Sequence, residues 1–134
     1  MSKPVRLILA VVAALLTWAV VATIINYGLR AAITGYRAEE VMLSFSLGSQ
    51  IARLALGLVA TAAAAIAAMV VNRGVMAAPV VAGFLLLAMF VPMHLRIWSR
   101  FPVWYHLFFL ASLPVVSYGA ARWWASRTPS QGAH

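Results

Sequence analysis

The sequence predicts an all-α integral membrane protein, a four-helix bundle in which each helix crosses a lipid bilayer. Of its 134 residues, 65% are hydrophobic and only 9% are charged, whereas soluble domains are about 25% charged. The mean hydropathy is +0.97. Four apolar runs are separated by polar connections, and each is close to the roughly 20 residues that a spanning helix needs. We therefore expect a single transmembrane domain over residues 1–134.

The first predicted span covers residues 7–27. Lys3 and Arg6 precede it, as they would precede the apolar core of a secretory signal. The run continues for a full bilayer width, however, without a small-x-small cleavage site followed by polar sequence. We expect an uncleaved first helix that ends with Tyr27 at the membrane interface.

The longest polar connection, residues 28–50, holds both acidic residues of the chain, Glu39 and Glu40. Apolar residues alternate with serine over 41–47, which in water would predict a strand. A lone strand in lipid leaves its backbone groups without partners. We therefore expect an interfacial loop or a short surface helix, framed by helix breaks at Gly35 and Gly48.

The second predicted span, residues 51–71, presents small residues at three- and four-residue steps: Gly57, Thr61, Ala65 and Ala68. Small residues at this spacing let two membrane helices approach closely. We expect this face to pack within the molecule, with a homodimer interface as the alternative.

Arg53, near the start of the second span, is the cation that we expect to lie below the lipid headgroups. A charge at that depth is costly unless it has a partner or reaches water. Two arrangements would satisfy it: extension of the side chain to the interface, or pairing with Glu39 or Glu40.

Proline positions define the third and fourth predicted spans, residues 79–95 and 102–121. Pro79 and Pro102 suit first turns of helices. Pro92 and Pro114 are expected to kink the two helices.

Ser112 and Ser117 are near enough in sequence to offer hydroxyls to the backbone that Pro114 disturbs. Residues 125–134, beyond Trp123 and Trp124, are expected to form a short mobile tail.

Four spans would place the first and third connections on one side of the membrane and both termini on the other. Cations flanking the spans are nearly balanced between the two sides: Lys3, Arg6, Arg73, Arg122 and Arg127 against Arg30, Arg37, Arg96 and Arg100. The small excess on the side of the termini predicts that both are cytoplasmic.

Two histidines form the candidate ligand site on the side of the first and third connections. A tight hairpin would bring His94 and His106 to a similar depth. With Glu39 or Glu40 they could bind a divalent metal, and the pair alone could bind a b-type haem. The favoured interpretation needs no cofactor. Each imidazole then either hydrogen-bonds a backbone carbonyl that Pro92 leaves without its helical partner or faces the headgroups.

Aromatic residues gather in the same hairpin, at Trp98, Phe101, Trp104 and Tyr105. Such residues are typical of a membrane-interface anchor. The alternative is a docking surface for a partner helix, a lipid headgroup or a quinone ring.

Three short motifs, RLALG at 53–57, VPMH at 91–94 and FPVWYH at 101–106, together resemble a family of small bacterial four-helix membrane proteins. The resemblance covers about half of the chain. It implies a multi-pass protein of a bacterial inner (plasma) membrane and no particular activity.

Composition excludes several classes of function. The chain has no cysteine, which rules out disulfides, thiolate nucleophiles, iron–sulfur clusters and thiolate zinc sites. The formal net charge is +8, but the cations stand as singles and close pairs beside apolar runs, where they meet anionic headgroups. No basic stripe is present, so we expect lipid as a partner and no nucleic acid.

Known small membrane proteins also differ from this chain. Residues 7–26 lack the acidic residue that proton-coupled small multidrug exporters carry in their first helix. The glycine-and-arginine first helix of fluoride channels is missing too, and two internal histidines are too few for a four-helix dihaem cytochrome. No Ser-His-Asp set or phosphate-binding loop is present, so we expect no enzymatic activity.

These observations favour a non-enzymatic accessory or assembly subunit that binds another membrane protein or a second copy of itself. The first alternative is an oligomeric small transporter or channel, because four short helices enclose too little volume for a permeation path of their own. The second alternative is a metal-, haem- or quinone-binding protein that uses His94 and His106.

Overall fold

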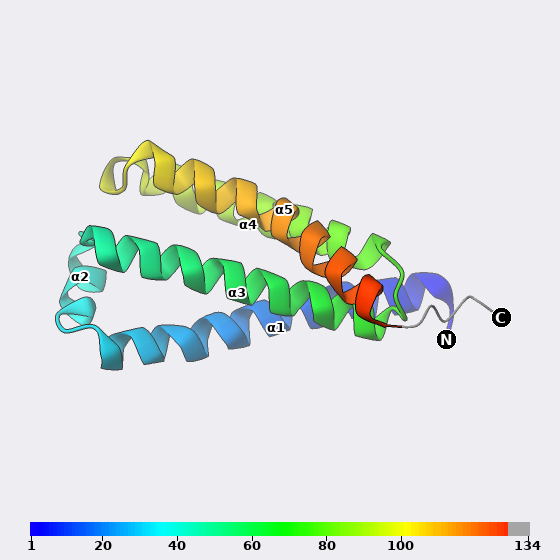
Figure 1. The fold of residues 1–134 in the computed structure, drawn as a ribbon. Helices are drawn as coiled ribbons and strands as arrows, with labels where there is room; N and C mark the ends of the chain where they lie inside the picture. Colours follow the sequence, from blue (N-terminus) through cyan, green and yellow to red (C-terminus); the bar gives the residue numbers. More distant parts are fainter. Residues whose placement is uncertain (129–134) are drawn as a thin grey trace.

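The computed structural model describes residues 1–128, and within that range it contains only helices, turns and loops (Figure 1). The α-helices are α1 (Lys3–Ala32), α2 (Tyr36–Met42), α3 (Leu47–Val71), α4 (Ala77–Arg96) and α5 (Val103–Arg127), with a 3-10 turn η1 (Trp98–Arg100) between the last two. All but α2 are long and apolar enough to cross a membrane. The predicted class, a four-helix membrane bundle, is confirmed.

The helices extend beyond most of the predicted spans. Hydropathy marks the part that would lie in hydrocarbon, but backbone hydrogen bonding continues until a cap ends it. At the start of α1 the Ser2 hydroxyl accepts from the Val5 amide at 3.4 Å. At the other end of the chain α5 runs to Arg127, so the predicted tail begins too early. Residues 129–134 lie outside the described residues.

The connection between α1 and α3 contains a short helix. The sequence predicted either such a helix or an interfacial loop. Gly35, at φ 83°, precedes α2 as predicted, because a left-handed residue breaks a helix at little cost when it is glycine. The prediction for Gly48 is wrong, since this residue lies in the first turn of α3. The break falls at Ser46, whose hydroxyl accepts from the Ser49 amide at 3.3 Å.

The prolines also differ in part from expectation. Pro79 lies in the first turn of α4, whereas Pro102 stands just before α5. Pro114 lies inside α5, but neither serine hydroxyl bonds the carbonyl that it frees. Ser112 donates to the Phe109 carbonyl and Ser117 to the Leu113 carbonyl, each at 2.6 Å, because a helical hydroxyl reaches the carbonyl three or four residues before it.

Two different cores hold the bundle together at its two ends. Toward the end where α1 begins, small side chains let α1, α3 and α4 approach closely, and we name them the alanine cluster: Ala10, Ala14, Ala64, Ala68, Ala78 and Ala82. Toward the α2 end the core is built from rings, the aromatic cluster: Tyr36, Phe45, Phe101, Tyr105 and Phe109. In Figure 1 the α4–α5 pair diverges from the α1–α3 pair toward the α2 end.

Candidate functional site

A cavity of about 420 Å³ lies where the helices diverge, with lining residues from α1, α2, α3, α4 and α5. We name it the α1–α4 cleft. Its inner end is formed by Trp18 of α1 and Phe90 of α4, whose ring centroids are 4.9 Å apart. The Trp18 indole donates to the Thr61 hydroxyl at 3.1 Å, which ties this ring to α3. The alanine cluster closes the bundle beyond it.

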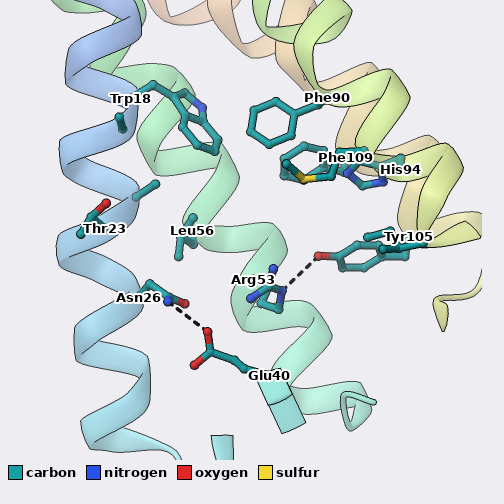
Figure 2. A pocket seen from close by; sticks show the side chains of 14 residues that line it. Trp18, Thr23, Asn26, Glu40, Arg53, Leu56, Phe90, His94, Tyr105 and Phe109 are labelled. Carbon is teal, nitrogen blue, oxygen red and sulfur yellow. Dashed lines mark hydrogen bonds between the residues drawn. The ribbon is translucent and has the colours of Figure 1, made fainter. Parts of the chain in front are cut away.

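The lining of the cleft is divided into an apolar and a polar part (Figure 2). Trp18 and Phe90 lie at one end, with Leu56 and Phe109 nearer the middle. At the other end the lining turns polar, with Asn26, Glu40, Arg53 and Tyr105. This end faces α2, so the polarity of the cleft rises toward the membrane surface at that end of the bundle.

Glu40 forms a closed network that joins α1 and α2. Arg30 donates to its two oxygens at 2.7 and 3.2 Å, and the Asn26 amide donates at 3.3 Å. The Arg30 guanidinium therefore holds the pKa of Glu40 below its usual value, against the opposing effect of burial. Glu39 is used differently, because its carboxylate accepts from the Ser46 amide at 3.0 Å just before α3 begins.

Arg53 has no carboxylate partner among residues 1–128, so of the two arrangements expected for it the pairing with Glu39 or Glu40 is wrong. Its guanidinium donates to the Tyr36 hydroxyl at 2.9 Å and to the Tyr105 hydroxyl at 3.4 Å. It also lies 4.6 Å from the centroid of the Phe45 ring, a cation–π contact. Both acids are turned toward other donors, which leaves Arg53 facing the cleft.

The Tyr36 hydroxyl links Arg53 to α1. It accepts from Arg53 and donates to the Asn26 side-chain oxygen at 2.9 Å. Burial raises the pKa of the Tyr36 hydroxyl, with Arg53 opposing the shift, so this group keeps the proton that it donates. Neither Tyr36 nor Asn26 was predicted as a site residue. The sequence offered two signals for them: Asn26 is a polar residue at the end of the first span, and Tyr36 is a tyrosine in an otherwise polar connection.

His94 and His106 meet, with their Nδ1 atoms 2.7 Å apart. The His106 Nε2 atom lies 3.0 Å from the Trp98 carbonyl oxygen, which can only accept, so this nitrogen carries the proton. With both rings uncharged, the His106 Nδ1 atom is then the acceptor and His94 Nδ1 the donor. The Nε2 atom of His94 is left as an acceptor without a protein partner in residues 1–128, and it is not fully buried.

The predicted metal set is not assembled in this arrangement, because Glu39 and Glu40 are bound elsewhere. No group of three or more potential metal ligands of the His, Cys, Asp and Glu types occurs within residues 1–128. The imidazole nitrogens are also 2.7 Å apart, closer than the roughly 3.3 Å that separates two nitrogens on one tetrahedral Zn²⁺. A metal or a haem iron between the rings would require them to separate. The carbonyl that His106 bonds belongs to Trp98, not to the backbone freed by Pro92.

The four aromatic residues of the hairpin do not act as one surface. Phe101 and Tyr105 are buried and stack on each other at 4.4 Å, because positions four apart share one face of the chain entering α5. Trp98 and Trp104 are exposed and remain available as interface anchors.

The small-residue face of α3 packs within the molecule. All four predicted residues, Gly57, Thr61, Ala65 and Ala68, are buried. A Cβ added at Gly57 would lie 2.9 Å from the Phe109 ring, so α5 covers this part of the face. A homodimer interface on the same face, the alternative prediction, has no accessible surface to use.

Comparison of the chain with protein-family models, with curated proteins and with solved structures finds no match. The resemblance carried by the three short motifs therefore stays a prediction. Any functional conclusion rests on the chemistry of the α1–α4 cleft.

Proposed function

We propose that this chain is a non-enzymatic multi-pass membrane protein that binds an amphipathic molecule from one leaflet in the α1–α4 cleft. The observation that carries the proposal is the change in the cleft lining from the rings of Trp18 and Phe90 at its inner end to the charged and polar side chains of Asn26, Glu40 and Arg53 at its outer end (Figure 2). A cavity of about 420 Å³ falls within the usual range of small-molecule sites. A lipid-like molecule would place its chain against Trp18 and Phe90 and its head beside Arg53.

The accessory or assembly role expected from the sequence stays a prediction, and ligand binding in the cleft is compatible with it. An oligomeric transporter or channel stays the alternative, because a permeation path between copies of the chain would not depend on the cleft of a single chain.

Filling the cleft tests the proposal. Ala22 lines the cleft, and Ala55 is an exposed alanine on α3 outside it. We expect Ala22→Phe to abolish the retention of a lipid-sized adduct in native mass spectrometry of the detergent-purified protein. Ala55→Phe, the matched control, should keep the adduct.

Equal adduct occupancy in the two phenylalanine variants would overturn the proposal. Circular dichroism of both proteins checks that the helical content is unchanged, so that a loss of adduct reports on the cleft.

A further inference from the structure

We infer that the head of the bound molecule is an oxyanion, the carboxylate or phosphate of an acidic lipid, held by Arg53 and the Tyr105 hydroxyl. This oxyanion site depends on the ligand binding proposed above and adds the chemistry of the ligand's polar end. Two features of the cleft support it, an uncompensated charge and a set of unused donors, and the depth of Trp18 provides a way to test it.

The charge is that of Arg53. Two charged side chains line the cleft, Arg53 and Glu40. Both oxygens of Glu40 already accept from Arg30 and Asn26, and the Arg30–Glu40 pair is the one salt bridge within residues 1–128. Arg53 has only tyrosine hydroxyls as polar partners. A cation inside a membrane protein normally has an opposite charge or a route to water, and an anionic head would supply that charge.

The donors are the remaining N–H groups of Arg53 and the hydroxyl proton of Tyr105. A guanidinium has five N–H donors, of which two have protein acceptors here. The Tyr105 hydroxyl accepts from Arg53 Nε, and its own proton has no acceptor within residues 1–128. Charge-assisted bonds of this kind suit the two or three oxygens of a carboxylate or phosphate.

Trp18 marks the position of the lipid chain. It lies eight residues before Asn26 on α1, about 12 Å along the helix axis at 1.5 Å per residue. A head at the level of Asn26 and Arg53 would therefore bring the middle of an extended acyl chain to the Trp18 ring. The second half of the chain would then leave the cleft sideways, into the surrounding lipid. Bromine atoms at mid-chain quench tryptophan fluorescence on contact, which makes Trp18 a local reporter of occupancy.

The experiment uses a variant that keeps Trp18 as its single tryptophan, with phenylalanine at the other four positions: Trp98, Trp104, Trp123 and Trp124. The protein is placed in nanodiscs of phosphatidylcholine. Dibromostearic acid and its methyl ester are then added separately, since they share one acyl chain and differ in the charge of the head. We expect the acid to quench Trp18 at about tenfold lower concentration than the ester.

Substitutions at the head site should remove this preference. Arg53→Gln should bring the acid and the ester to the same half-quenching concentration, and Arg53→Lys should restore most of the difference. Tyr105→Phe keeps the buried ring and should reduce the preference severalfold, which keeps the test informative if Arg53→Gln disturbs folding. Arg96→Gln removes an exposed cation at the same end of the bundle and should change nothing.

A phosphate head is tested with brominated phosphatidic acid against brominated phosphatidylcholine, with the same expectation. Inorganic phosphate distinguishes a lipid from a free anion: displacement of dibromostearic acid by equimolar inorganic phosphate would overturn the lipid assignment. A second basic cavity, which includes Lys3 and Arg6, lies near the start of α1. Arg6→Gln removes a cation of that cavity and should leave the quenching of Trp18 by the acid unchanged.

The outcomes separate the two proposals. Equal quenching by acid and ester, lost for both in Ala22→Phe, would refute the oxyanion site and leave ligand binding standing. Quenching that Ala22→Phe does not change would refute ligand binding in the cleft itself.

Discussion

Glu40 ties the surface helix α2 to α1 through Arg30, and its charge makes that tie dependent on pH. The pKa of Glu40 is lower in the folded protein than its ordinary value of 4.5. Its ionised form is therefore favoured by folding, so the stabilisation is present above pH 4.5 and is lost as the pH falls through the lowered folded value. The pair is partly exposed, which keeps the effect modest.

For Glu40→Gln we expect a thermal unfolding midpoint a few degrees below that of the wild type at pH 7. At pH 3, below the ordinary pKa of 4.5, the gap should shrink, because the carboxyl of the unfolded wild type is then protonated and must lose that proton to form the ion pair. Circular dichroism of the two proteins in the same detergent at both pH values measures the gap. A gap of the same size at pH 3 and pH 7 would show that charge at this position does not stabilise the fold.

Some contacts between single residues could be predicted from the sequence, and others could not. Two imidazoles at the facing ends of a short hairpin could be predicted to meet, because helix ends fix their depth. The partners of Arg53 could not, because they depend on how α2 and α5 are rotated about their axes. Hydropathy says little about that rotation in α5, whose apolar residues surround the helix. The rotation turns Tyr36 and Tyr105 toward Arg53 and turns Glu39 away.

At the scale of the elements, α4 and α5 approach each other closely at Gly83. A Cβ built there would lie 2.7 Å from the Ser117 hydroxyl oxygen, 2.8 Å from the Ser117 Cβ and 3.2 Å from the Leu113 carbonyl oxygen. Backbone and buried side chain of α5 therefore both resist any larger residue at this position.

We expect Gly83→Ala to destabilise the protein by about 1–3 kcal/mol, seen as a lower midpoint of SDS-induced unfolding. Gly119→Ala is the matched control, since Gly119 is a helical glycine of α5 with no atom near a built Cβ. It should be neutral or slightly stabilising, because alanine favours a helix over glycine. Similar midpoints for the two variants would mean that α4 and α5 do not approach as closely as described.

The number of membrane-spanning helices was predicted correctly from the sequence, but the residues at which they begin and end were not. Apolar runs fixed the four spans, since hydrocarbon thickness sets a minimum length. The caps did not follow from hydropathy: Ser46 begins α3 by a local hydrogen bond, and Gly48 two residues later does not interrupt it. Local polar bonding decided these boundaries.

For the whole molecule, an even number of spans places α2 and the turn between α4 and α5 at one end of the bundle (Figure 1). The chain has no cysteine, so single-cysteine variants need no modified background. Ser44→Cys and Ser99→Cys are conservative changes at exposed positions of that end, and Ser126→Cys is one near the end of α5.

We expect an impermeant maleimide to label Cys variants of positions 44 and 99 from the same side of sealed vesicles, and position 126 from the other. Labelling after detergent treatment controls for the reactivity of each thiol. Labelling of positions 44 and 99 from opposite sides would be incompatible with four crossings. The same experiment would also give the absolute orientation, which the nearly balanced cations predict only as a small preference for cytoplasmic termini.

Every helix of the protein contributes a side chain to the α1–α4 cleft, and the last helix contributes Tyr105 and Phe109. During translation, a nascent chain that has inserted only its first three membrane helices would therefore lack one wall of the cavity. Capture of the proposed ligand would then have to wait until α5 is inserted. Occupancy of the cleft would thus distinguish a chain with all four membrane helices in place from an earlier intermediate of membrane insertion.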